Sequence, residues 1–210
     1  MDRPKEIIAW GRAPILLVAG LAVMAHVFPE LSDRLVYDRR AVLAGEFWRI
    51  LTAPLAHFSA GHLFWNLLAL VAAGLAIHQA GFKGFGPAFV FAAATPGVVF
   101  LAVCPEMERY GGLSGPATAA AAFFCLKHIL ETEKNQAMWL IILLLMAAKI
   151  VAEAAVDAPI FARGGETPFR PLPSAHILGS LGALGAVWRS RLKPPFSGAP
   201  GACLNRGQND

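Results

Sequence analysis

Residues 61–80 read GHLFWNLLALVAAGLAIHQA and contain no Asp, Glu, Lys or Arg. A helix of about 20 residues is long enough to cross the hydrocarbon core of a bilayer. Backbone groups in lipid must hydrogen-bond within their own segment, and a single apolar run can do this only as a helix. The sequence therefore predicts a membrane-spanning helix over these residues.

Five further apolar stretches are long enough to cross, or nearly cross, the same core: 13–28, 85–104, 114–127, 137–157 and 173–189. The composition agrees, because only 15% of the residues are charged, whereas soluble domains carry about 25%. We predict an all-α membrane protein, a bundle of six transmembrane helices.

The chain divides into one domain and two short ends. We expect a cytoplasmic N-terminal segment over 1–12, a membrane domain over 13–189 and a disordered cytoplasmic tail over 190–210. The short connections around Lys83 and 127–134 carry lysines, and Lys or Arg in short connections favours the cytoplasmic side. Both termini are then cytoplasmic. The net charge of +4 comes from such short stretches and does not indicate nucleic-acid binding.

The first connection, from Pro29 to Ala60, is long and contains Phe47, Trp48 and Phe58. Long ordered connections are often functional. Aromatic residues of this kind favour the membrane interface, so we predict a long first loop that is partly embedded in the membrane. An interfacial loop without a function explains the same residues.

Polar side chains inside membrane spans are costly and are candidates for function. Four are prominent: His62 and Asn66 in the second predicted span, Ser114 at the start of the fourth and His176 near the start of the sixth. With a cytoplasmic N-terminus, these three spans all run inwards from the outer side. Their first turns are therefore expected to lie at the same side of the membrane.

Ser114 and His176 each lie thirteen residues before a basic residue, Lys127 and Arg189 respectively. At 1.5 Å per residue, both are about 20 Å above the cytoplasmic ends of their spans. A hydroxyl and an imidazole at one depth can form a nucleophile and its base. The imidazole takes the hydroxyl proton as the oxygen attacks a carbonyl carbon.

The surroundings of these residues suit that chemistry. Pro116 favours a helix that begins near Ser114, where the dipole and the first backbone N–H groups can hold an oxyanion. His62 and Asn66 lie four residues apart, share a helix face and can both donate hydrogen bonds. No Asp or Glu is expected beside His176, which predicts a dyad.

Packing explains some of the same residues. A serine between glycines is, taken alone, more typical of a close helix contact than of a nucleophile. Lys149 and Glu153, one turn apart in the fifth span, could be a buried pair or could mark the outer end of that helix. The three cysteines lack the spacing of metal ligands, so no metal is expected.

Three motifs, in this order, resemble those of the rhomboid intramembrane serine proteases. Residues 48–52 and 57–66 are similar to the family's first loop and second helix, including its HxxxN pair. Residues 112–115, GLSG, are similar to its GxSG motif, and residues 175–179, AHILG, to the sixth-helix histidine motif. The resemblance extends over about 45–187.

This resemblance implies a rhomboid-like bundle with Ser114 as nucleophile and His176 as general base. It implies that His62, Asn66 and the Ser114 N–H bind the oxyanion. It implies no cofactor and no metal. The substrates would be single-pass transmembrane proteins, cleaved near the outer face in contact with membrane lipid, and the location a bacterial inner membrane.

Residues 37–40, 45–46 and 48–49, together with the short six-span layout, look more like the bacterial rhombosortase branch. Members of that branch are thought to process proteins with a C-terminal Gly-Gly, helix and basic-tail signal. Thr118 departs from both patterns, since rhomboids often have Tyr there and rhombosortases often have His. A non-catalytic relative that binds membrane helices is a further alternative. A transporter is disfavoured, because the sequence has no inverted repeat.

Overall fold

The computed structural model describes residues 11–132, 134–156 and 173–192. The long helices of this part are α1 (Arg12–Val27), α5 (Ala60–Gln79), α6 (Phe85–Val103), α7 (Ser114–Glu131), α8 (Gln136–Val156) and α9 (Pro173–Leu192). The all-α expectation is confirmed. The terminal segments predicted at 1–12 and 190–210 lie mostly outside the described residues.

The six long helices coincide with the six predicted spans to within a few residues. By length and composition α5, α6 and α8 can each cross a membrane. A fourth candidate joins α1 to α2 (Pro29–Leu35), although the two are bent by 117°. A count of six spans therefore stays a prediction.

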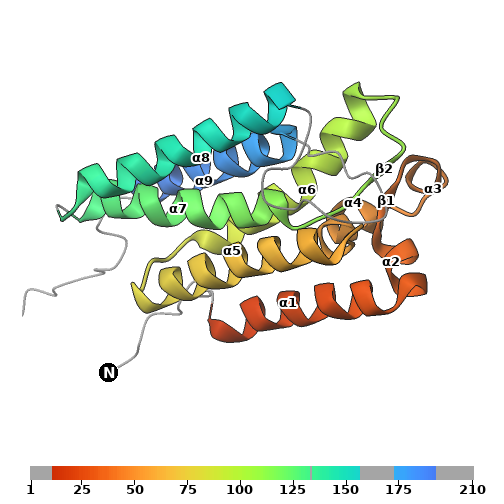
Figure 1. Ribbon diagram of the computed structural model, residues 1–210, viewed down its shortest axis with the longest axis horizontal. Helices are drawn as coiled ribbons and strands as arrows, with labels where there is room; N and C mark the ends of the chain where they lie inside the picture. The colour runs from red at the N-terminus through yellow and green to blue at the C-terminus, as the bar shows by residue number, and fades with distance from the viewer. Residues whose placement is uncertain (1–10, 133, 157–172, 193–210) are drawn as a thin grey trace, which may run out of the picture.

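The long helices form an antiparallel bundle (Figure 1). α5, α7 and α9 all begin at the end of the bundle where β1 (Tyr37–Asp38) and β2 (Arg109–Tyr110) pair. α1, α6 and α8 run in the opposite direction. The first turns of α5, α7 and α9 therefore lie at one end of the molecule.

α7 occupies the centre of the bundle and contacts α5, α6, α8 and α9. Nine of its eighteen residues are buried, and four of these nine are alanines. Small side chains let helix backbones approach closely, which is how helices associate in a membrane. The sequence of α7 thus places its N-terminus among several neighbouring helices.

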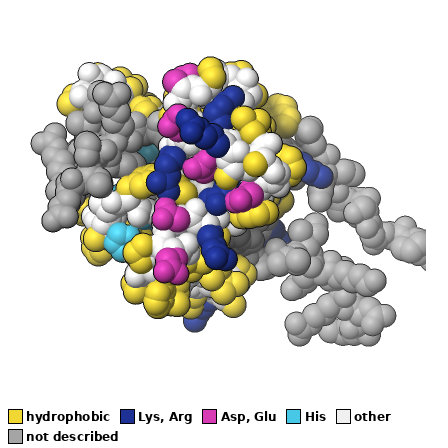
Figure 2. Space-filling view, turned by 90° about the vertical axis from the view of Figure 1, so that its right-hand side faces the viewer, with side chains coloured by type: hydrophobic (Ala, Val, Ile, Leu, Met, Phe, Trp, Pro, Cys, Tyr) yellow, Lys and Arg dark blue, Asp and Glu magenta, His cyan; other side chains and the backbone are white. Residues whose placement is uncertain are grey.

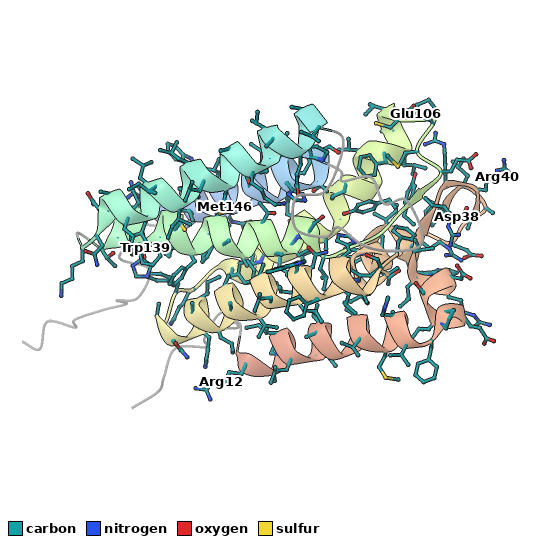
Figure 3. All side chains as sticks on the ribbon, in the orientation of Figure 1. Arg12, Asp38, Arg40, Glu106, Trp139 and Met146 are labelled. Atoms are coloured by element: carbon teal, nitrogen blue, oxygen red, sulfur yellow. The ribbon has the colours of Figure 1, made fainter. Side chains whose placement is uncertain are left out.

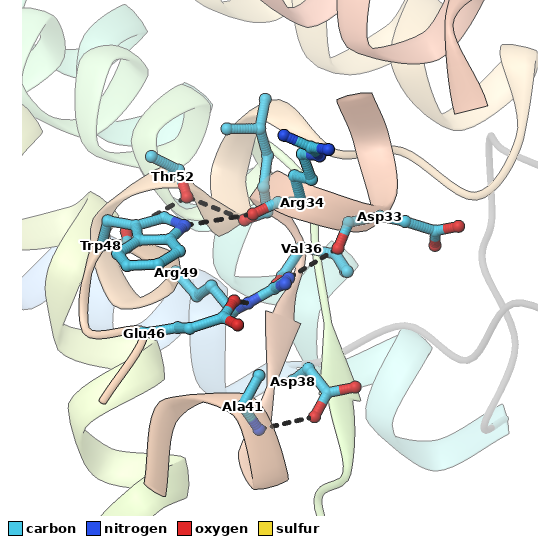
Figure 4. Close-up of polar contacts among 10 residues, drawn as sticks. Asp33, Arg34, Val36, Asp38, Ala41, Glu46, Trp48, Arg49 and Thr52 are labelled. Carbon is cyan, nitrogen blue, oxygen red and sulfur yellow. Dashed lines mark hydrogen bonds and ion pairs between the residues drawn. The ribbon is translucent and has the colours of Figure 1, made fainter. Parts of the chain in front are cut away.

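The connection between α1 and α5 is folded into short elements: α2, β1, α3 (Arg39–Leu43), α4 (Trp48–Thr52) and the 3-10 turn η1 (Ala53–Leu55). Arg49 holds this segment together (Figure 4). Its Nη1 donates to the carbonyls of Asp33 and Val36 at 2.6 and 3.0 Å, and its Nε to Glu46 at 2.6 Å. The embedding of this segment in the membrane stays a prediction.

The end of the bundle that carries β1 and β2 is rich in charge. Figure 2 shows Lys, Arg, Asp and Glu side chains gathered across it. The described pairs include Arg109 with Asp33 at 2.6 Å and Arg40 with Glu108 at 3.7 Å. Figure 3 labels Arg40 and Glu106 at this end and Arg12 at the other. Charges thus mark both ends of an apolar bundle.

Candidate active site

The four residues predicted from the sequence lie in the first two turns of three helices. His62 and Asn66 are in α5, Ser114 is the first residue of α7, and His176 is the fourth residue of α9. The side chains of His62, Asn66 and His176 are buried, and Ser114 is half-buried. All four therefore belong to the same end of the bundle (Figure 1).

α7 and α9 touch through their backbones beside these residues. A Cβ on Gly179 would lie 2.3 Å from the carbonyl oxygen of Gly115. A Cβ on Gly115 would lie 3.2 Å from the carbonyl oxygen of Ala175. Ser114 is the neighbour of Gly115 and His176 the neighbour of Ala175, so the contact brings the two residues to the same level of adjacent helices.

The loop before Ser114 is fitted closely around His62. Gly112 has a φ of 120°, and a Cβ there would lie 2.5 Å from Cε1 of the His62 ring. Only glycine satisfies both the backbone conformation and this contact. The Gly112 N–H donates to the carbonyl of Ala53 at 3.2 Å. The His62 imidazole thus packs on the loop that leads to the serine.

His57, to which the sequence assigned no role, holds the same loop. Its Nε2 accepts the N–H of Leu113 at 3.2 Å, and the amide nitrogen of Asn66 lies 3.3 Å from the same atom. Its Nδ1 lies 3.2 Å from the carbonyl of Leu55 and so carries the ring proton. The one signal in the sequence is a histidine directly before the second span.

The neutral form of His57 is the one that fits, because an imidazolium cannot accept from Leu113. His57 lies in the connection before α5, and burial lowers its pKa from 6.5 to about 4. A histidine pKa that is lower in the folded than in the unfolded protein makes the fold most stable at pH values above the unfolded pKa. This contribution to the free energy of unfolding is lost as the pH falls from about 6.5 towards 4. The loss corresponds to about 3 kcal/mol.

We expect the thermal unfolding midpoint in detergent to fall more steeply between pH 6.5 and pH 4 in the parent than in His57→Gln. The glutamine can accept the Leu113 N–H but does not titrate. The measurement is unfolding followed by circular dichroism at several pH values. Parallel pH profiles for the two proteins would contradict this role of His57.

The expectation that no acidic side chain lies beside His176 is wrong. Glu153 of α8 is only 3% exposed, and Lys149 pairs with it at 2.7 Å. The charges of both side chains act on the His176 imidazole. Lys149 and Glu153 therefore form a pair near the end of α8, in which Glu153 is buried and Lys149 is half-buried.

The arrangement provides a hydroxyl at a helix N-terminus, an imidazole on the adjacent helix, and hydrogen-bond donors from α5. These are the groups that an acyl transfer needs, namely a nucleophile, a base and an oxyanion site. Within the described part of the chain, no three His, Cys, Asp or Glu residues cluster in a way that could hold a metal ion.

A family model described as the rhomboid domain matches residues 44–193, well over half of the 210-residue chain. The match begins just before α4 and includes α5 to α9. It therefore covers every site residue described above. No curated protein matches the chain.

Proposed function

The chain belongs to the rhomboid family, and from this premise we propose that it is a serine protease that cleaves other proteins within the membrane. It is an integral membrane protein with apolar helices long enough to span a bilayer. Ser114 is the proposed nucleophile and His176 the proposed general base. The backbone contact of Gly115 with Ala175 and Gly179 carries this proposal, because it puts these residues at the same level of adjacent helices.

In the proposed reaction the Ser114 hydroxyl oxygen bonds to the carbonyl carbon of the scissile peptide, and its proton passes to His176. The Ser114 N–H, with His62 and Asn66, stabilises the negative charge on the carbonyl oxygen. The carbon–nitrogen bond then breaks, and His176 returns the proton to the leaving amine. Water, deprotonated by His176, releases the acyl group from Ser114.

A fluorophosphonate probe tests the proposed nucleophile directly. The probe phosphonylates an activated serine and releases fluoride, so we expect one label per chain, at Ser114, as located by mass spectrometry. A heat-unfolded sample should not be labelled. Labelling at another serine, or labelling that is the same before and after unfolding, would contradict the proposed activation.

The oxyanion donors should affect the rate more than substrate binding. We expect Asn66→Ala and His62→Ala each to lower kcat roughly a hundred-fold with little change in KM, because each removes a hydrogen bond that strengthens in the transition state. Cleavage kinetics in proteoliposomes measure this. His78→Ala, at the other end of α5, is the control, and equal losses in all three variants would contradict the assignment.

The proposed substrates are single-pass transmembrane proteins cut near the outer membrane face, with both termini of the enzyme in the cytoplasm of a bacterium. A narrower proposal is a rhombosortase, supported by the resemblance of residues 37–40, 45–46 and 48–49. Two tagged substrates separate these proposals: one with a C-terminal Gly-Gly, helix and basic tail, and one with alanines in place of both glycines. Equal cleavage would reject the narrower proposal.

A further inference from the structure

α8 lies at the edge of the bundle with most of its side chains exposed, as expected for a helix that faces lipid. All 21 of its residues are described, and Glu153 alone is buried. An acidic side chain inside a membrane bundle is costly unless it is paired. The one buried position of α8 therefore holds an acidic residue, where close packing by itself would favour an apolar one.

Glu153 lies on the face of α8 that packs inwards. Leu143 and Met146, ten and seven residues before it, pack against the buried core of the bundle, and Met146 is labelled in Figure 3. Seven residues are close to two helical turns, so Met146 and Glu153 lie along one face. This face meets α7 and α9. Glu153 therefore points towards the helices that carry Ser114 and His176.

Among the described residues, four charged or titratable groups act on the two site histidines, and two of the four come from α8. Glu153 and Lys149 both act on His176, and Lys149 also acts on His62, which faces the site from α5. Without Glu153, an imidazolium at His176 would form near the Lys149 ammonium and would lose the carboxylate that offsets the repulsion. With Glu153, the carboxylate offsets part of this repulsion and so favours the imidazolium, although Lys149 has the larger influence on His176.

We propose that Glu153 is a positioning residue, which acts through His176 as the third group of the catalytic machinery, and that Lys149 holds its carboxylate in place. This inference rests on the proposed protease activity. The carboxylate orients the imidazole and stabilises the positive charge that His176 gains when it takes the Ser114 proton. The reaction then uses an acid, an imidazole and a hydroxyl from three helices, α8, α9 and α7.

Removal of the charge should lower the rate and leave binding intact. We expect Glu153→Gln to reduce kcat roughly a hundred-fold or more with KM nearly unchanged. Glu153→Asp should retain a substantial part of the activity, since it keeps the charge. Lys149→Met combined with Glu153→Gln should be more active than Glu153→Gln alone, because the uncompensated ammonium is gone.

Reversal of the pair separates a catalytic role from a structural one. The double variant Lys149→Glu with Glu153→Lys keeps an ion pair at the same spacing but places a cation where the carboxylate was. We expect an unfolding midpoint close to that of the parent and a loss of cleavage. The matched control is the same reversal of Lys127 and Glu131, an ion pair of equal spacing at the other end of α7, which should leave kcat unchanged.

Cleavage by the parent is measured first, with Ser114→Ala as the inactive reference. An inactive parent that also fails to react with the fluorophosphonate would overturn the proposed function, and the role of Glu153 with it. An active parent whose kcat survives Glu153→Gln or the reversed pair would overturn the role of Glu153 alone. If the Glu153→Gln variant does not fold, the kcat values of Glu153→Asp and of the reversed pair test the role of Glu153 instead, because both variants keep an ion pair in α8.

Discussion

Ser114→Ala and His176→Ala are each expected to reduce proteolysis roughly a thousand-fold or more. The first removes the oxygen that bonds to the substrate carbonyl, and the second removes the group that takes its proton. The double variant should be no slower than either single variant, because the two side chains act as one unit. The measurement is initial cleavage of a tagged transmembrane substrate in proteoliposomes.

Matched variants show whether the loss is chemical. Ser190→Ala removes a serine of α9 that bonds only locally, to the carbonyl of Val187, and should cleave at the parental rate. The unfolding midpoints of Ser114→Ala and the parent should agree within a few degrees, since a half-buried hydroxyl contributes little to stability. Cleavage by Ser114→Ala at more than a tenth of the parental rate would refute the assignment. A non-catalytic helix-binding relative would instead show no cleavage by the parent itself.

The long helices could be predicted from the sequence because their apolar runs are bounded by charges and glycines. The run predicted at 61–80 forms α5, Ala60–Gln79, and that predicted at 85–104 forms α6, Phe85–Val103. Because successive spans alternate in direction, the sequence also predicted that the first turns of α5, α7 and α9 lie at one end, as they do in Figure 1. These inferences need only local composition and the alternation of direction.

The short elements before α5 could not be predicted, because distant contacts fix them. Arg39, for example, donates to the carbonyls of Phe100 and Leu101 at 3.0 and 3.1 Å, at the C-terminal end of α6. Carbonyls at the end of a helix are short of backbone donors and take donors from elsewhere; the Phe100 carbonyl accepts the Cys104 N–H as well as Arg39. No local pattern in the sequence links residue 39 to residue 100.

The same reason explains the error about Glu153. The depth of a residue in the membrane can be counted along its helix from the sequence. The direction of its side chain depends on which face of the helix packs against other helices, and the sequence does not give that packing. Lys149 and Glu153 near the end of an apolar run are equally consistent with an outer helix end. The structure removes the ambiguity by placing Leu143 and Met146 of the same face against the core.

Hydropathy also separates the central helices from the peripheral ones. α8, which has one buried residue, has a mean hydropathy of 2.2, the highest of the candidate spans. α7, with nine buried residues, is not among those candidates. A helix surrounded by protein can carry small and polar side chains, because its neighbours replace lipid. The helices that carry Ser114 and His176, α7 and α9, are thus both missed when spans are sought by composition alone.

The contact between Gly115 and Gly179 should be among the least tolerant positions of the chain. A Cβ on Gly179 would lie 2.3 Å from the Gly115 carbonyl oxygen, which is backbone and cannot rotate away. Gly179→Ala must therefore separate α7 from α9. Overpacking of this kind costs about 1–3 kcal/mol. A displacement of about 1 Å between catalytic groups can lower the rate roughly a hundred-fold, so we expect a large loss of kcat.

Two further glycines of α9 provide a graded series. A Cβ on Gly182 would meet the Phe91 ring at 2.7 Å, and a ring can shift, so Gly182→Ala should cost less. A Cβ on Gly185 would meet nothing within 4 Å, and Gly185→Ala should be neutral or stabilising by up to about 1 kcal/mol. Unfolding midpoints and kcat should therefore both rise in the order 179, 182, 185. Full activity in Gly179→Ala would show that the reaction does not need the close approach of these two helices, and the pairing of Ser114 with His176 would lose its structural basis.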